Sequence, residues 1–472
     1  MQQKRKEKMQ KLDGFALLCS AGVILCLLWD LLKILRLPGT DEINTYITMG
    51  QMVLAGLMIA RGCLWRYRWW QCLALGLGWM LVSAGLQASV SVLGETAVPL
   101  QRGVLAFCVF CPLGCLLNEK QIRRFLCVFS SVWTACYAVL SCIGVYAALN
   151  DTLIYNFNRT LTIGISPSLR RFALFHYPTV TSSYLCIAIL IALLGSVLVR
   201  RKWAKACFVL ACVPMLICLS LTDGRGAFVS LGAAIGLGCS VHLYGTLLKK
   251  WNMKAALAVC CVVVACTTAV MYVAMPRVLD GFNGVKKHVQ QTGGWITSAM
   301  AEETAEELEP TEEAETAPVE AVHRTQSSLG FLSGRQYVWK AAMELLRDHP
   351  RLLLTGTSPT QVMRYIQPYL ADAPMQGYMH THNLFLQVLV EGGVIALGLL
   401  IWFLVCFARA AFRLLLDTER SMWMRCLPIP AVAILIGELV DYITQLSTAL
   451  QVTPLLMLFM GLTLVLGSKK YN

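Results

Sequence analysis

Apolar runs of roughly 20 residues recur along the whole chain and are separated by short polar connections. A run of this length forms an α-helix that crosses a hydrocarbon core of about 30 Å. About twelve such helices are predicted, so the fold class expected is an all-α polytopic membrane protein. The predicted spans are residues 14–33, 46–60, 70–93, 103–118, 125–148, 180–199, 204–221, 226–247, 255–275, 393–412, 427–441 and 452–467.

The composition supports this interpretation. Of the 472 residues, 57% are hydrophobic and 14% are charged, whereas a soluble protein carries about 25% charged residues. A transmembrane β-barrel would show short alternating segments instead of long apolar runs. The twenty cysteines lie in or beside the apolar runs, so no disulfide framework is expected. No histidine and carboxylate residues have metal-ligand spacing, and therefore neither a metal nor another cofactor is expected.

The distribution of positive charge predicts the orientation in the membrane. More than half of the 40 lysines and arginines fall in the first residues and in every second connection. Such connections stay in the cytoplasm. With an even number of spans, both termini are then cytoplasmic, and the two long polar segments, residues 149–178 and 277–381, are extracytoplasmic.

Three regions follow from this topology. Residues 1–276 form an N-terminal transmembrane region of about nine helices, and residues 382–472 form a C-terminal region of about three. Residues 277–381 form a large loop between them. Within this loop, residues 301–320 hold nine glutamates among Pro, Ala and Thr, a composition typical of a disordered tether. Residues 333–349 have apolar positions at helical spacing and predict an amphipathic helix.

Arg225 is the most informative charge in the chain. It lies in a very short turn between two apolar spans, where an isolated cation is costly. It also precedes a helix, whose N-terminus favours anions. A structural interpretation pairs Arg225 with Asp223 or with lipid headgroups. The functional interpretation is a phosphate clamp, because a guanidinium group is planar and permanently charged.

Further candidates lie in the two long polar segments. Arg170 and Arg171 precede the sixth span, and Arg335 begins the predicted amphipathic helix. Two histidines, His380 and His382, stand where the large loop meets an apolar run. An imidazole can accept a proton near neutral pH, so this pair is a candidate catalytic site.

These residues together resemble a known family, the O-antigen ligase and polymerase superfamily. The resemblance rests on His382-Asn383-Leu-Phe-Leu with Gly393 ten positions after Asn383, and on the Arg225-Gly226 turn. It rests also on Arg335-x-x-x-Trp339, followed by His349-Pro350 and Gly356. The stretch from Arg171 to Tyr184 matches less well, because Ala173 and Pro178-Thr179 replace the usual Gly and Pro-Asn. The resemblance covers about residues 170–415.

The resemblance implies a metal-independent, inverting glycosyltransferase. Such an enzyme moves a glycan from an undecaprenyl-diphosphate carrier to an acceptor hydroxyl at the outer face of the bacterial cytoplasmic membrane. Arg225 and Arg335 would hold the diphosphate, and His382 would act as the general base. Arg170, Arg171, His380 and Asn383 would help to bind substrate, with His380 the competing candidate for the base.

Several alternatives remain open. The acceptor can be a glycan, a lipid or a protein, so ligase and polymerase are not distinguished. A transporter or flippase of lipid-linked oligosaccharide would have a similar number of helices, although the sequence shows no repeat between its halves. The partners expected are the lipid-linked donor, the acceptor and the bilayer, and no nucleic acid.

Overall fold

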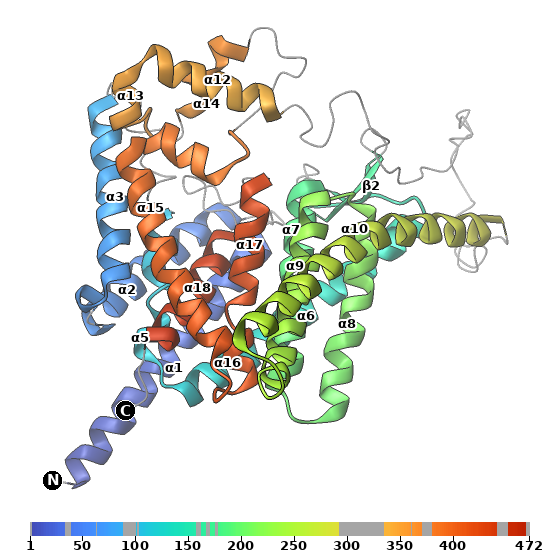
Figure 1. Cartoon of the computed structure of the whole chain (residues 1–472), viewed down its shortest axis with the longest axis horizontal. Helices are drawn as coiled ribbons and strands as arrows, with labels where there is room; N and C mark the ends of the chain where they lie inside the picture. The colour runs from blue at the N-terminus through green and yellow to red at the C-terminus, as the bar shows by residue number, and fades with distance from the viewer. Residues whose placement is uncertain are drawn as a thin grey trace.

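The fold is described from a computed structural model, which shows a bundle of helices with a layer of short helices at one end (Figure 1). The residues described are 2–33, 39–62, 64–87, 101, 103–156, 162–166, 170–174, 178–291, 335–359, 361–370, 380–440 and 452–468. The predicted tether, residues 301–320, lies outside them.

Within these residues, ten helical segments are long and apolar enough to cross a membrane, which agrees with a multi-pass, mostly helical protein. Two shorter apolar helices, Gly103–Leu116 and Thr453–Ser468, occupy the other two predicted spans. The elements that form the ten are α1 (Gln2–Leu32), α2 (Thr40–Gly62), α3 (Arg68–Gln87), α6 (Glu119–Leu149), α7 (Pro178–Leu198), α8 (Lys202–Leu221), α9 (Arg225–Leu247), α10 (Met253–Gln291), α15 (Leu384–Leu416), and α16 (Met422–Cys426) with α17 (Ile429–Val440). The shorter helices contain α5 (Leu113–Leu116) and α18 (Val452–Ser468), and a short 3-10 turn, η2 (Leu64–Arg66), precedes α3.

The helices differ in how much of their surface the protein covers. Helix α7 is buried along most of its length, whereas α2 and α10 are largely exposed. In a bilayer, exposed apolar faces meet lipid, so α7 belongs to the core and the other two to the periphery. Helices α7, α9 and α15 all begin at one end of the bundle, which is called the site end below.

A small antiparallel sheet lies at the site end, and the sequence pattern did not predict it. It consists of β1 (Ile154–Tyr155), β2 (Thr162–Ser166) and β3 (Arg171–Leu174), in the order β1-β2-β3. Phe172 of β3 is fully buried. A Cβ atom on Gly144 of α6 would lie 2.5 Å from the Phe172 ring, so the strand is pressed closely against that helix.

Four short elements form a second layer over α3 and α15 at the site end (Figure 1). Helix α12 (Arg335–Asp348) covers the stretch where an amphipathic helix was expected, and Val338, Ala341, Ala342 and Leu345 form its buried face. They pack with Leu352, Val362, Ile366 and Val390 in a separate apolar core. The other elements of the layer are α13 (Pro350–Thr355), α14 (Val362–Ile366) and η3 (Gln367–Leu370).

Helix α15 is broken at Gly393, which has φ 69° and ψ −170°. The predicted span of residues 393–412 therefore corresponds to the second part of a longer helix that begins at Leu384 and ends at Leu416. The predicted boundary at residue 393 was wrong, since the helix already begins at Leu384. A positive φ suits glycine, since it has no Cβ atom to clash with the backbone.

The break leaves carbonyl groups without their usual partners one turn later, and neighbouring segments satisfy them. The loop that follows α13 donates to two of them, from Thr357 N to Val390 O (2.7 Å) and from Ser358 N to Glu391 O (3.0 Å). Trp79 of α3 donates its Nε1 proton to Gly392 O at 2.7 Å. The second layer is thereby hydrogen-bonded directly to the interior of a membrane helix.

We expect Gly393→Ala to destabilise the protein by about 2 kcal/mol or more, because the backbone is strained and the new methyl group has no room. Its Cβ atom would lie 2.1 Å from Leu354 O. Thermal unfolding of the purified protein in detergent measures the effect. Gly398→Ala is the matched control, since nothing lies within 4 Å of a Cβ atom there. Equal melting temperatures for the two variants would contradict this description of the break.

Candidate functional site

The turn between α8 and α9 places Arg225 at the start of a helix. Thr222, Asp223 and Gly224 form this turn, and Arg225 is the first residue of α9. We call residues 222–225 the arginine turn. Arg225 is half-buried, and its backbone N–H donates to Asp223 O at 3.1 Å. The first N–H groups of a helix and its dipole attract anions, so the position suits a phosphate-binding side chain.

The arginine turn packs closely against the start of α7. A Cβ atom on Gly224 would lie 2.3 Å from Ser182 Cβ and 2.4 Å from Ser182 Oγ. Thr222 Oγ1 accepts a hydrogen bond from Gly224 N at 3.3 Å. Only glycine fits this contact, and its packing fixes where α9 and Arg225 begin.

The structure brings Arg171 to the arginine turn. Arg171 Nη2 donates to Asp223 Oδ2 at 2.7 Å, and both side chains are largely buried. The sequence had offered Asp223 as a partner of Arg225, and it missed the pairing with Arg171 because 52 residues separate the two. An ion pair this sheltered depends on both partners, since either charge alone would be costly to bury.

Arg170 has a different environment. It is exposed and lies in the turn between β2 and β3, with φ 49°. Arg171 alternates with the buried Phe172 along β3, so the strand directs Arg171 towards Asp223. The two neighbouring arginines that the sequence grouped together are therefore not equivalent.

Residues His380–Asn383 form a compact turn before α15, which we call the histidine turn. The two imidazole rings lie with their centroids 4.2 Å apart. His380 Nδ1 accepts a hydrogen bond from His382 N at 3.3 Å. This bond uses one ring nitrogen of His380, whereas His382 contributes its backbone. The geometry thus gives the two histidines different chemical settings.

His382 has a φ of 54°, and Asp223 and Arg170 also have positive φ. Left-handed backbone is uncommon outside glycine and costs about 1–3 kcal/mol when strained. Such conformations concentrate at functional sites. Their presence in both turns is consistent with the role that the sequence suggested for these segments.

Asn383 caps α15 and also joins it to α17. Its side-chain oxygen accepts from Leu386 N at 3.0 Å, as an N-cap residue does. Its amide nitrogen donates to Leu439 O at 3.1 Å. Aspartate could supply only the first bond, so asparagine suits the position. A role for Asn383 in substrate binding stays a prediction.

A series of buried hydrogen bonds connects the histidine turn to polar side chains of α15. Thr381 N donates to Gln387 Oε1 at 2.9 Å, and Gln387 Nε2 donates to Glu391 Oε1 at 2.8 Å. All three residues are buried. The sequence analysis did not identify Gln387. It could have been found from the spacing of Gln387 and Glu391, two polar residues four positions apart in an apolar helix.

Helix α12 reaches the histidine turn through Trp339, whose Nε1 donates to Thr381 O at 2.7 Å. Arg335 is half-buried at the first position of the same helix, one turn before Trp339. Residues one turn apart share a helix face. The face of α12 that carries Arg335 is therefore attached to the histidine turn.

The two turns lie at the same end of the bundle, with α17 between the helices that bear them (Figure 1). Helix α17 packs along α9 and also contacts α15. The bond from Asn383 to Leu439 O fastens the histidine turn to the end of α17. Arg225, Arg171 and the two histidines thus belong to one continuous framework.

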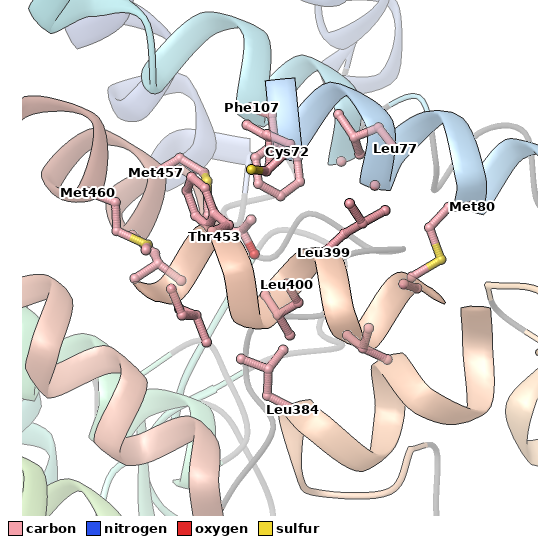
Figure 2. Close-up of a pocket in the computed structure, with 18 of the residues that line it drawn as sticks. Cys72, Leu77, Met80, Phe107, Leu384, Leu399, Leu400, Thr453, Met457 and Met460 are labelled. Atoms are coloured by element: carbon pink, nitrogen blue, oxygen red, sulfur yellow. The ribbon is translucent and has the colours of Figure 1, made fainter. Parts of the chain in front are cut away.

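An apolar cavity of about 90 Å³ lies next to the histidine turn, between α3, α15, α18 and the helix Gly103–Leu116 (Figure 2). Leu384 and Val388 of α15 line it, as do Met80 and Met457. The lining is largely hydrocarbon, so the cavity suits an alkyl or prenyl chain and excludes a sugar or a diphosphate. Polar chemistry belongs at the two turns instead.

Among the residues that the structure describes, no three His, Cys, Asp or Glu side chains are grouped as metal ligands. The arginine turn and α12 carry guanidinium groups, and the histidine turn carries imidazole groups. Guanidinium groups bind anionic oxygens, and imidazole transfers protons.

We expect Trp339→Phe to loosen the histidine turn, because phenylalanine keeps the ring but loses the bond to Thr381 O. A hydrogen bond contributes about 1 kcal/mol, so amide exchange in residues 380–387 should accelerate about fivefold. Hydrogen–deuterium exchange measures this rate. Tyr337→Phe is the control, since Tyr337 is exposed on the same helix. Unchanged exchange in Trp339→Phe would argue against the attachment.

Part of the chain matches a family model. No curated protein matches the chain. Residues 210–401, less than half of the chain, match the model of the family described as O-antigen ligase. The matched stretch begins within α8 and ends within α15, and it includes the arginine turn, Arg335 and the histidine turn. This match shows that residues 210–401 are similar to the O-antigen ligase family.

Proposed function

We propose that this protein moves a glycan from an undecaprenyl-diphosphate carrier to an acceptor hydroxyl at the outer face of a bacterial cytoplasmic membrane. The observation that best supports the proposal is that residues 210–401, which match the family, contain both the arginine turn and the histidine turn. These two turns lie at one end of a membrane bundle. The site end then faces outward, and both chain termini are cytoplasmic.

The diphosphate of the donor is the group that the arginines would bind. Arg225 at the start of α9 and Arg335 at the start of α12 would hold its oxygens. Negative charge develops on the diphosphate as the bond to the sugar breaks, and fixed cations in a low-dielectric site stabilise it. Arg171 would support the same charge from beside Asp223, and Arg170 would contact the donor from its exposed turn.

His382 would act as the general base. The acceptor oxygen attacks the anomeric carbon of the sugar while its proton passes to the His382 ring. The bond from that carbon to the phosphate oxygen breaks, and the electron pair leaves with the diphosphate. One glycosidic bond forms as one sugar–phosphate bond breaks, with inversion at carbon. His380 would bind the acceptor beside it.

The hydrocarbon part of a lipid-linked substrate would bind in the apolar cavity, apart from the polar groups of the two turns. Leu384 lines the cavity and lies two residues after His382. A chain held there would have its head near the histidine turn. Ligase and polymerase differ only in the acceptor, so transfer assays with lipid, peptide and carrier-linked glycan acceptors distinguish them.

Arg225→Ala and Arg335→Ala should each lower the rate of glycan transfer by about 100-fold or more, as removal of a charge-stabilising donor does in other enzymes. Arg225→Lys should recover only part of the rate, because lysine cannot form the paired hydrogen bonds of a guanidinium group. The assay follows a labelled undecaprenyl-diphosphate glycan. Arg351→Gln removes an exposed arginine of α13 and should retain the normal rate. Full activity in Arg225→Ala would remove Arg225 from the proposed site.

His382→Gln should lower transfer by about 100- to 10,000-fold, the range for loss of a general base. His380→Gln should have a smaller effect, because the Nδ1 atom of His380 accepts a backbone bond within the turn. Both variants should reach the membrane at normal levels, which immunoblotting of membrane fractions checks. The reverse order of the two effects would assign the base to His380.

A further inference from the structure

Helix α10 leaves the bundle at the site end, and its ribbon bends before it runs outward (Figure 1). It contains one internal proline, Pro276. Proline lacks the N–H that would bond the carbonyl four residues earlier, and it kinks membrane helices for that reason. The segment before Pro276 is apolar, whereas the segment after it carries Arg277, Asp280, Lys286 and Lys287.

An open groove of about 610 Å³ lies on the exposed face of α10 at this bend. Ala269, Val270, Val273, Ala274 and Val278 form its apolar wall, and Arg277 is the charged residue among the described residues that line it. The valines are well exposed, with Val270 at 63%. Helix α9 packs on a different side of α10, where Gly232 lies against Thr268 and Met271.

The groove lies at the depth of one membrane surface. Residues 255–276 of α10 carry no charge, and Lys254 and Arg277 are the charged residues on either side of this stretch. The hydrocarbon core is about 30 Å thick. Because charged side chains avoid the hydrocarbon core, we expect Arg277 among the headgroups of the leaflet at the site end and the apolar wall among the acyl chains.

Arg277 is exposed, and none of the described carboxylates forms an ion pair with it. Asp280 lies one turn further along α10, and its charge opposes the binding of an anion in the groove. Lys286, by contrast, is buried and paired with Asp151 at the end of α6. That pair fastens the outer part of α10 to the bundle, so the groove has a fixed wall.

We propose that this groove binds one anionic phospholipid from the leaflet at the site end. The phosphate accepts hydrogen bonds from the Arg277 guanidinium group, and an acyl chain lies along the alanines and valines. A guanidinium group recognises phosphate through charge-assisted hydrogen bonds. The small side chains of Ala269 and Ala274 leave the space that the acyl chain occupies.

Native mass spectrometry of the full chain with added phosphatidylglycerol or phosphatidylcholine tests the proposal. Phosphatidylglycerol should bind more tightly at one site, and Arg277→Gln should weaken that binding about tenfold. Asp280→Asn should strengthen it about twofold, a gain that damage to the fold would not produce. Ala274→Phe should fill the groove and weaken binding with the charge unchanged.

Two matched variants control for position. Arg351→Gln removes another exposed arginine, and Val262→Phe enlarges an exposed valine of α10 outside the groove. Both should bind phosphatidylglycerol as the unchanged chain does. The proposal is overturned if Arg277→Gln and Arg351→Gln bind it equally, or if phosphatidylcholine binds as tightly. It is also overturned if undecaprenyl diphosphate displaces the phospholipid in a manner that depends on Arg277.

Discussion

The break in α15 is the constraint on which the arrangement of the site depends. Gly393 interrupts the helix, and the carbonyl groups released there are bonded by Thr357, Ser358 and Trp79. A carbonyl group without a hydrogen bond at membrane depth costs several kcal/mol. The released carbonyl groups therefore need these donors in place of the helical N–H groups. These hydrogen bonds attach the layer that contains α12, α13 and α14 to a membrane helix. Trp339 then fixes that layer to the histidine turn.

The arginine turn is organised by charge. Asp223 is buried against Arg171, and the backbone of Arg225 is bonded to the same residue. The sheltered carboxylate of Asp223 keeps the charge of Arg171 tolerable in the absence of an anion. A bound diphosphate would supply further negative charge. Asp223 would then position the guanidinium group of Arg171 and the backbone of Arg225 before the substrate arrives.

Much of the architecture could be predicted from the sequence because the bilayer restricts the alternatives. Apolar runs gave the membrane helices, and the spacing of Val338, Ala341 and Leu345 gave the face of α12. The histidines and Arg225 were found as polar residues at the ends of such runs. These inferences depend on local patterns, which a single sequence displays directly.

Other features could not be predicted because they depend on contacts between distant segments. The strands of the small sheet are two to five residues long, too short for a clear alternation. The pairing of Arg171 with Asp223 joins a strand to a helix turn. The predicted span of residues 393–412 covered only part of α15, because the partners that allow a break inside this helix lie in α3 and in the loop after α13.

The most direct test of the central claim is an experimental structure of the full chain with an undecaprenyl-diphosphate glycan bound. The account predicts diphosphate oxygens about 2.7–2.9 Å from the guanidinium nitrogens of Arg225 and Arg335. It also predicts the His382 ring on the opposite side of the anomeric carbon, where an acceptor hydroxyl would enter. A diphosphate bound away from Arg225, with His382 too far from the sugar for one acceptor oxygen to lie between them, would contradict it.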